Sequence, residues 1–204
     1  MFVQMIRGPI GDVEGLRRQM DVWMRDHAPA AEGWLGTTAG VTEDGEAVAV
    51  VRFASAEAAR RNSERSEQGQ WWSETEQLFD GPVEFTDYPD SALLLGGGSE
   101  DAGFVQAMQG RTTDLERLNA LQQEMGDRLH ELRPEILGGT YAWDDQGRVL
   151  QVAYFTSEAE AREGEARMEK APVDFRAANE EFEKLTSEKR YLDLRDPWLW
   201  SAGS

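Results

Sequence analysis

Apolar residues recur along the chain with two different spacings. Short runs rich in β-branched and aromatic residues, such as FVQMI from Phe2, are typical of strands. Between such runs, Val13, Leu16 and Met20 recur every three or four positions, which indicates one face of a helix. Over residues 1–90 the pattern predicts a strand, a helix, two strands joined by the turn sequence EDG, helical pieces and a last strand.

Polar residues and prolines mark the ends of the predicted helices. Asp12, Ser55 and Ser157 stand just before helical patterns, where their side chains can accept hydrogen bonds from free backbone N–H groups. Pro29 and Pro134 follow the two long helical patterns and mark where they stop. The predicted strands are 2–6, 33–42, 46–55 and 82–88 in the first half, and 104–108, 138–144, 148–157 and 189–194 in the second.

The same order of elements occurs twice. Shifted by 102 positions, FVQMIRG at 2–8 falls on FVQAMQG at 104–110, and the match continues without a gap for about sixty residues. One added residue then brings Trp72 onto Phe175, and a few more bring Asp87 opposite Leu194. The order β-α-β-β-α-β is that of a ferredoxin-like unit. We therefore predict an α+β fold of two such repeats, residues 1–90 and 104–204, joined by a Gly- and Ser-rich linker over 91–103.

The third predicted strand suggests why a second copy is present. AVAVVRF, from Ala47, is apolar at almost every position, so both of its faces need cover. A ferredoxin-like unit places its helices on one face of the sheet only. We expect the two repeats to pack sheet to sheet, so that one chain is a monomer with an internal pseudo-dimer. Whether two chains associate further into a homodimer stays open.

Composition and charge exclude several kinds of partner. The formal net charge of −18 repels phosphate backbones and anionic lipids, so we expect neither nucleic acid nor membrane as a partner. The chain has no cysteine, which excludes disulfides and thiolate metal sites. We see no basic start followed by an apolar run, and no apolar stretch close to membrane-spanning length. We expect a cytoplasmic protein.

A strand that ends in an aromatic residue and leads into an Ala-rich helix occurs in both repeats, as VVRFASAEAARR from Val50 and VAYFTSEAEARE from Val152. Together with the repeat, this resembles the dimeric α+β barrel superfamily, and within it the antibiotic-biosynthesis monooxygenase-like proteins, as a tandem fused pair. The resemblance covers nearly the whole chain. It implies a pocket between the sheet and the helices of each repeat.

The resemblance also implies chemistry. Some members oxygenate aromatic polyketides without metal or flavin, using a substrate that forms its own carbanion. Members that degrade haem carry a histidine nine residues after the strand-end aromatic, whereas this chain has Asn62 and Gly164 there, which argues against haem breakdown. An asparagine on the first strand of those members falls near Gln4 and Gln106 of this chain.

Candidate site residues follow from the pattern and from the resemblance. His27, at the end of a helical apolar stripe, is the candidate catalytic base or, alternatively, a core histidine bound to a carbonyl. Gln4 and Gln106 either bind ligand or tie down backbone, and a ligand role predicts that Gln4→Leu abolishes binding but keeps the fold. Arg52, a charge in an apolar strand, either forms a structural ion pair or binds an anionic ligand. The remaining candidates are aromatic side chains that would line the pockets: Phe53, Trp71, Trp72, Tyr141 and Phe155.

Three functions remain open on the sequence. The first is a monooxygenase-like enzyme that acts on a small aromatic or apolar molecule, with no cofactor and no metal. The second is a module that binds a hydrophobic or haem-like ligand without reaction. The third is a stress or interaction protein whose acidic surface or Trp-rich tail acts. In that tail, Trp198 and Trp200 alternate with Leu199, which suggests a terminal strand lying across the other unit or, less simply, a partner-binding segment.

Overall fold

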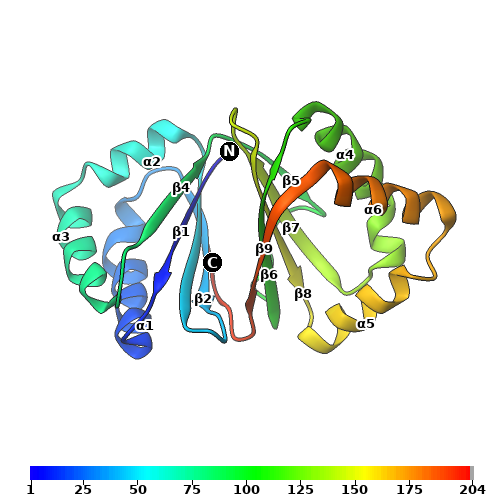
Figure 1. Ribbon diagram of the computed structural model, residues 1–204. Coiled ribbons are helices and arrows are strands. Elements are labelled where there is room, and N and C mark those ends of the chain that lie inside the picture. The colour runs from blue at the N-terminus through cyan, green and yellow to red at the C-terminus, as the bar shows by residue number, and fades with distance from the viewer. Residues whose placement is uncertain (203–204) are drawn as a thin grey trace. The chain divides into compact units, whose positions relative to one another are not determined.

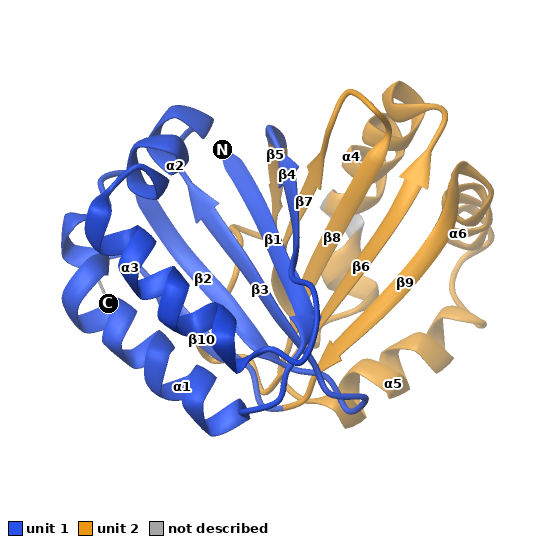
Figure 2. Cartoon of the chain, turned by 60° about the vertical axis from the view of Figure 1, so that its left-hand side comes forward, with its two compact units in different colours: residues 1–90, 196–204 blue, residues 91–195 orange. Residues whose placement is uncertain are grey.

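The computed structural model describes residues 1–202, and the side chains of all of these except 127 and 128. The chain divides into two compact units (Figure 2). Unit 1 comprises Met1–Asp90 and Asp196–Ser204, and unit 2 comprises Ser91–Arg195. No helix among the described residues is long and apolar enough to cross a membrane.

Each unit contains three α-helices and five strands in the described chain. In unit 1 these are β1 Phe2–Pro9, α1 Val13–Val22, β2 Trp34–Val41, β3 Glu46–Phe53, α2 Ala56–Ser63, α3 Ser66–Thr75, β4 Glu84–Tyr88 and β10 Trp198–Ser201. In unit 2 they are β5 Asp90–Leu94, β6 Phe104–Thr112, α4 Leu115–Leu132, β7 Ile136–Trp143, β8 Arg148–Phe155, α5 Glu158–Met168, α6 Val173–Leu185 and β9 Thr186–Leu194.

The two sheets have the same strand order. It is β10-β2-β3-β1-β4 in unit 1 and β5-β7-β8-β6-β9 in unit 2. In each unit the three helices lie on one face of the sheet (Figure 1). Without the outermost strands β10 and β5, this is the arrangement of a ferredoxin-like repeat, so the predicted α+β fold with two such repeats is confirmed. The packing of one sheet against the other stays a prediction.

The structure divides the chain differently from the predicted boundaries at two places. Asp90–Leu94, at the start of the expected linker, forms β5 beside β7. The tail forms β10, which pairs antiparallel with β2 from Trp198 opposite Ala39 to Ser201 opposite Gly36. The expectation of a terminal strand is therefore confirmed. Each added strand covers what would otherwise be an open sheet edge, which exposes unpaired N–H and C=O groups.

The polar residues that precede the helices act as caps. Asp12 accepts a hydrogen bond from the backbone N–H of Gly15 at 2.8 Å, and Ser55 accepts from that of Ala58 at 3.1 Å. The equivalent residues of unit 2, Asp114 and Ser157, do the same. These bonds satisfy donors that a helix start leaves without an intrahelical partner.

The repeated aromatic residues form the start of the core in each unit. Phe2 lies opposite Phe53 on β1 and β3, and Phe104 lies opposite Phe155 on β6 and β8. In unit 2 the two rings are 5.7 Å apart and pack with Ile136, and all three are buried. The repeat seen in the sequence is thus a repeat of core contacts.

Candidate functional site

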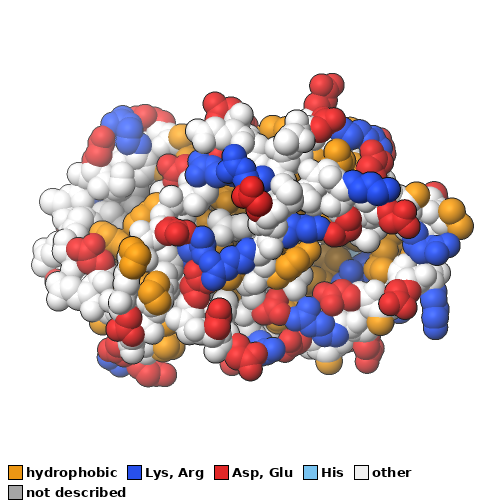
Figure 3. All heavy atoms as spheres, viewed as in Figure 1, with side chains coloured by type: hydrophobic (Ala, Val, Ile, Leu, Met, Phe, Trp, Pro, Cys, Tyr) orange, Lys and Arg blue, Asp and Glu red, His pale blue; other side chains and the backbone are white. Residues whose placement is uncertain are grey.

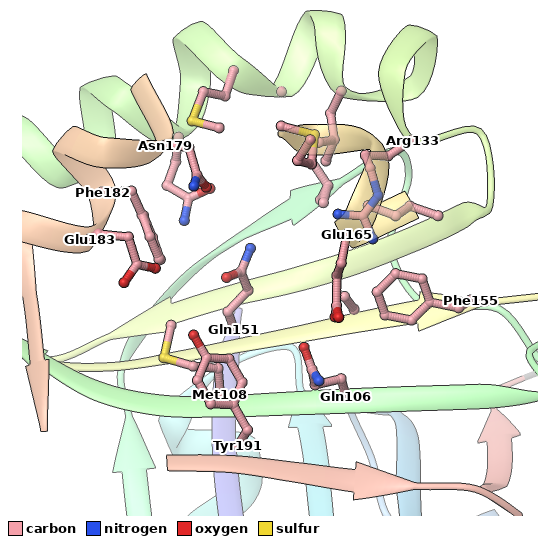
Figure 4. Close-up of a pocket in the computed structure, with 18 of the residues that line it drawn as sticks. Gln106, Met108, Arg133, Gln151, Phe155, Glu165, Asn179, Phe182, Glu183 and Tyr191 are labelled. Carbon is pink, nitrogen blue, oxygen red and sulfur yellow. The ribbon is translucent and has the colours of Figure 1, made fainter. Parts of the chain in front are cut away.

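A cavity of about 600 Å³ lies within unit 2, between the sheet and α4, α5 and α6 (Figure 4). Its floor comes from the strands, where Met108 on β6 lies directly opposite Gln151 on β8. Its roof contains apolar side chains of the helices, among them Met125, Phe175 and Phe182. A volume of this size suits a small organic ligand, since ligand pockets span roughly 300–1,000 Å³. On the face seen in Figure 3, the surface over unit 2 is hollowed and hydrophobic side chains form the bottom of the hollow.

The matching space in unit 1 measures only about 100 Å³. Gln4, Phe53 and the indole rings of Trp23, Trp71 and Trp72 are among the groups that line it. The ring of Trp23, which is 5% exposed, lies 6.4 Å from that of Trp71.

Small and flexible residues stand at the corresponding places of unit 2. Under the 102-residue shift, Trp23 corresponds to Met125, and Met24 corresponds to Gly126. A Cβ added at Gly126 would meet only Leu94, at 3.8 Å. Unit 2 therefore has a ligand-sized cavity where unit 1 has a much smaller space.

Both predicted glutamines form the same polar pair. Gln4 Nε2 donates to Asp87 at 2.7 Å, and Gln106 Nε2 donates to Asp193 at 2.8 Å. The pairing corrects the sequence alignment, because Asp87 corresponds to Asp193 and not to Leu194. Within residues 1–202, the Oε1 atom of Gln106 accepts no hydrogen bond, so it remains available to a ligand.

Charged groups line the cavity beside Gln106. Arg162 of α5 binds the carboxylates of Asp193 and Glu165, the latter at 3.1 Å. Burial by itself would lower the pKa of the Arg162 guanidinium, but its hydrogen bond and charge interaction with Asp193 raise that pKa overall. Glu165 extends from α5 toward Gln106 on the floor (Figure 4). A carboxylate, a guanidinium and an amide therefore meet at one wall.

A second ion-pair cluster lies at the same end. Glu135, with 4% of its side chain exposed, binds Arg133 Nε and also Arg167 Nη2 at 2.7 Å. Arg133 itself lines the cavity. A Cβ on Gly164 would overlap Oε1 of Glu135, so the cluster occupies the space beside this glycine. In the family that the sequence resembles, a histidine often stands at the position of Gly164.

The structure brings only part of the predicted site together. Gln106 and Phe155 line the large cavity. His27 lines neither cavity: its ring lies 6.5 Å from that of Trp71, and its buried Nδ1 has no hydrogen-bond partner among the described residues. Arg52 lies on the strand face away from α1–α3 and across Gly36, and it lines neither cavity.

Tyr141 lies next to the large cavity without lining it. It packs with Leu118 and Val149, and its ring is 5.2 Å from that of Trp143. Burial raises the pKa of its hydroxyl well above the usual range, and no described residue bonds to that hydroxyl. The phenol is therefore neutral at ordinary pH.

Several residues of the cavity were not predicted. They are Gln122, Arg133, Gln151, Glu165 and Asn179. A comparison of the repeats contains a signal for two of them: Gln122 stands where the first repeat has Met20, and Gln151 stands where it has Ala49. A polar residue at a position that is apolar in the sister repeat indicates a local change from core to cavity.

Solved structures match this fold over the whole chain. The "putative monooxygenase" of Lactobacillus acidophilus aligns with a TM-score of 0.73 and 11% identity, covering 98% of this chain and 99% of its own. The "putative monooxygenase" of Fusobacterium nucleatum aligns with a TM-score of 0.74 and 8% identity, covering 100% and 95%. The chain has the fold of these monooxygenase-like proteins.

An anthrone oxidase-like protein also has this monooxygenase-like fold, with a TM-score of 0.67, 13% identity and coverage of 100% of this chain and 94% of its own. No protein-family model matches the sequence, and no curated protein matches it. Identities this low establish the monooxygenase-like fold and leave the activity to be argued from the site.

Proposed function

We propose that the cavity of unit 2 binds a small, flat, mainly apolar molecule with oxygen substituents and oxygenates it without a bound cofactor. The observation that carries the proposal is the cavity itself, about 600 Å³ with an apolar roof and amide groups on its floor. Gln151 and Asn179 point toward each other across it (Figure 4), and neither forms a hydrogen bond with the described part of the chain. Amides in such positions orient a ligand through donors and acceptors.

The reaction class fits a substrate whose methylene group is acidified by neighbouring aromatic rings and a carbonyl. Glu165 takes one proton from this carbon, and the resulting carbanion passes an electron to O₂. Recombination gives a hydroperoxide, which loses water. One oxygen atom ends in a new carbonyl group, the other leaves in water with the two methylene hydrogens, and the substrate supplies all four electrons.

Other groups of the wall support this step. The ion pair between Arg162 Nη1 and Glu165 Oε1, at 3.1 Å, holds the carboxylate at the wall of the cavity. The free Oε1 of Gln106 accepts a hydrogen bond from a substrate hydroxyl. The apolar roof excludes water that would protonate the carbanion.

A binding function without reaction is the second candidate. One observation favours it: each carboxylate that lines the cavity already has a cationic partner. Glu165 and Asp193 bind Arg162, and Glu183 binds Lys189. Carboxylates held in this way stabilise the cavity wall. They move less readily into a position from which they could accept a proton from the ligand.

Oxygen uptake with 1,8-dihydroxyanthrone tests the enzyme. This compound has an activated methylene group, and the anthrone oxidase-like neighbour motivates the choice. We expect uptake of one O₂ per product formed, with a loss of about 100-fold in the rate for Glu165→Gln, in line with typical general-base contributions. Tight binding of the compound with no oxygen uptake supports the binding function instead.

A cavity-filling variant is the matched control. Met125→Trp with Gly126→Met introduces the larger residues that stand at the equivalent positions of unit 1, Trp23 and Met24. This variant should abolish both binding and uptake while keeping the fold. Activity that survives the filling places the reaction elsewhere and refutes the proposal.

A further inference from the structure

We infer that Arg133 binds an acidic oxygen of the ligand, so that the cavity selects aromatic molecules that carry a carboxylate, sulfonate or phenolate group. This inference rests on the proposed use of the unit 2 cavity for a ligand. It concerns the chemical class of that ligand and not the reaction.

The guanidinium of Arg133 has donors to spare. Its Nε binds Glu135, and its Nη2 donates to the backbone oxygen of Ala161 at 3.2 Å. Its Nη1 donates to no described residue, and the side chain lines the cavity. Because an arginine fork binds carboxylate and related oxyanions with two parallel N–H groups, the free hydrogens suit an anionic oxygen.

The charge balance of the cluster favours an anion. Glu135 is shared between two guanidinium groups, those of Arg133 and Arg167, so the three charges sum to +1. The other arginine of the lining, Arg162, pairs with three carboxylates, those of Glu158, Glu165 and Asp193. The uncompensated positive charge at this cavity therefore lies in the Arg133 cluster, where burial strengthens its interaction with an anion.

An aromatic ring lies beside the cation. The guanidinium carbon of Arg133 is 5.8 Å from the centre of the Phe155 ring, and Phe155 also lines the cavity. Figure 4 shows both side chains at the same end, apart from Gln151 and Asn179. An aromatic ligand that stacks near Phe155 would place its acidic substituent at Arg133.

The cation occurs only in the repeat that has the cavity. Under the 102-residue shift, Arg133 corresponds to Ala31 and Glu135 to Gly33. Gly164, which leaves room for the cluster, corresponds to Asn62. The cavity and the cationic group are thus two features that distinguish unit 2 from unit 1, and Arg133 of the cationic group lines the cavity.

Two fluorescent probes test the inference because they differ in one group. 8-Anilinonaphthalene-1-sulfonate and N-phenyl-1-naphthylamine have the same ring system, and only the first carries an anionic sulfonate. The wild-type protein should bind the sulfonate probe more tightly. Arg133→Gln should lower the affinity for the sulfonate probe at least tenfold, as expected for the loss of a charge-assisted hydrogen bond. The affinity for the neutral probe should stay within twofold of the wild-type value.

Controls separate Arg133 from net charge and from folding. Arg176→Gln makes the same change of charge at an exposed residue that does not line the cavity, and it should alter neither affinity. Circular dichroism monitors the fold of each variant. If Arg133→Gln does not fold, Arg133→Lys keeps the charge and loses the fork, and it should bind the sulfonate probe several-fold more weakly than the wild type does.

The outcomes distinguish this inference from the proposed function. If both probes bind, the cavity-filling variant removes both, and Arg133→Gln or Arg133→Lys affects them equally or not at all, then the anion preference is wrong and the cavity still binds ligands. If neither probe binds, or the cavity-filling variant has no effect, then the proposed ligand site itself is refuted.

Discussion

Replacing Gly164 by alanine should destabilise this protein, although the same change inside a helix ordinarily stabilises it. Gly164 lies in the middle of α5, where alanine is favoured over glycine by about 1 kcal/mol. Here, however, the added Cβ would overlap Oε1 of Glu135 and lie 2.5 Å from Nε of Arg133. The ion-pair cluster would have to move.

The size of the effect follows from the burial of Glu135. Only 4% of its side chain is exposed, and two arginines hold it. Breaking a buried ion pair by removing one partner costs about 3–5 kcal/mol, and a displaced pair loses part of that. After subtracting the helix gain of about 1 kcal/mol, we expect the free energy of unfolding to fall by about 2 kcal/mol.

Urea denaturation measures this change, and the chain offers a matched control. Gly126→Ala is also a change inside a helix, but its Cβ meets only Leu94, at 3.8 Å, so it should stabilise by about 0.5–1 kcal/mol. Opposite signs for the two variants are the expected result. If Gly164→Ala is as stable as Gly126→Ala, the Glu135 carboxylate does not occupy the space beside α5, and the placement of Arg133 loses its support.

Three further predictions test other parts of the structure. Gln106→Leu should weaken binding of 1,8-dihydroxyanthrone about tenfold, as expected for the loss of a hydrogen bond to the ligand, whereas Gln4→Leu should have no effect because the space beside Gln4 is only about 100 Å³; isothermal titration measures both. Burial by itself would raise the pKa of Asp144, but hydrogen bonds from Arg148 lower it overall. Asp144→Asn should therefore lower the free energy of unfolding by about 2 kcal/mol at pH 7. The loss should shrink as the pH falls below about 4, because a carboxylate whose pKa is lowered by folding stabilises the protein only while it is ionised, and a loss that is independent of pH contradicts this. A chain that ends at Arg195 lacks β10 and leaves the edge of β2 open, so its thermal midpoint should fall and its tendency to aggregate should rise in light scattering; an unchanged midpoint argues against the β10–β2 pairing.

The fold was predictable because its determinants are local and occur twice. Alternation in the strands, Asp12 and Ser55 before helices, and the EDG turn each act over a few residues. The repeat then confirmed each element from a second copy. The strand β5 was not predicted, because DSALL is short and precedes a glycine-rich turn, and only its pairing with β7 makes it a strand.

The site was predictable only in part. Gln106 and Phe155 stood out because both repeats keep them, and they line the cavity. The same logic also selected Gln4, in the unit with the smaller space, whereas His27 was proposed as a base because it is a histidine on an apolar helical stripe. Similarity between the repeats identifies what both units need for folding, whereas the proposed site depends on where they differ.

The sequence by itself determined the order of elements, their caps and turns, and the division into two ferredoxin-like repeats, because these follow from hydrophobic spacing and backbone chemistry within short segments. Only the tertiary structure decided which repeat holds a cavity and which residues face it. The volume of a cavity between a sheet and its helices is the enclosed volume minus the volume of the side chains that project into it. This is a small difference between two large quantities. Trp23, which packs near Trp71 in one unit, and its counterpart Met125 in the other change that difference through contacts between segments far apart in the sequence.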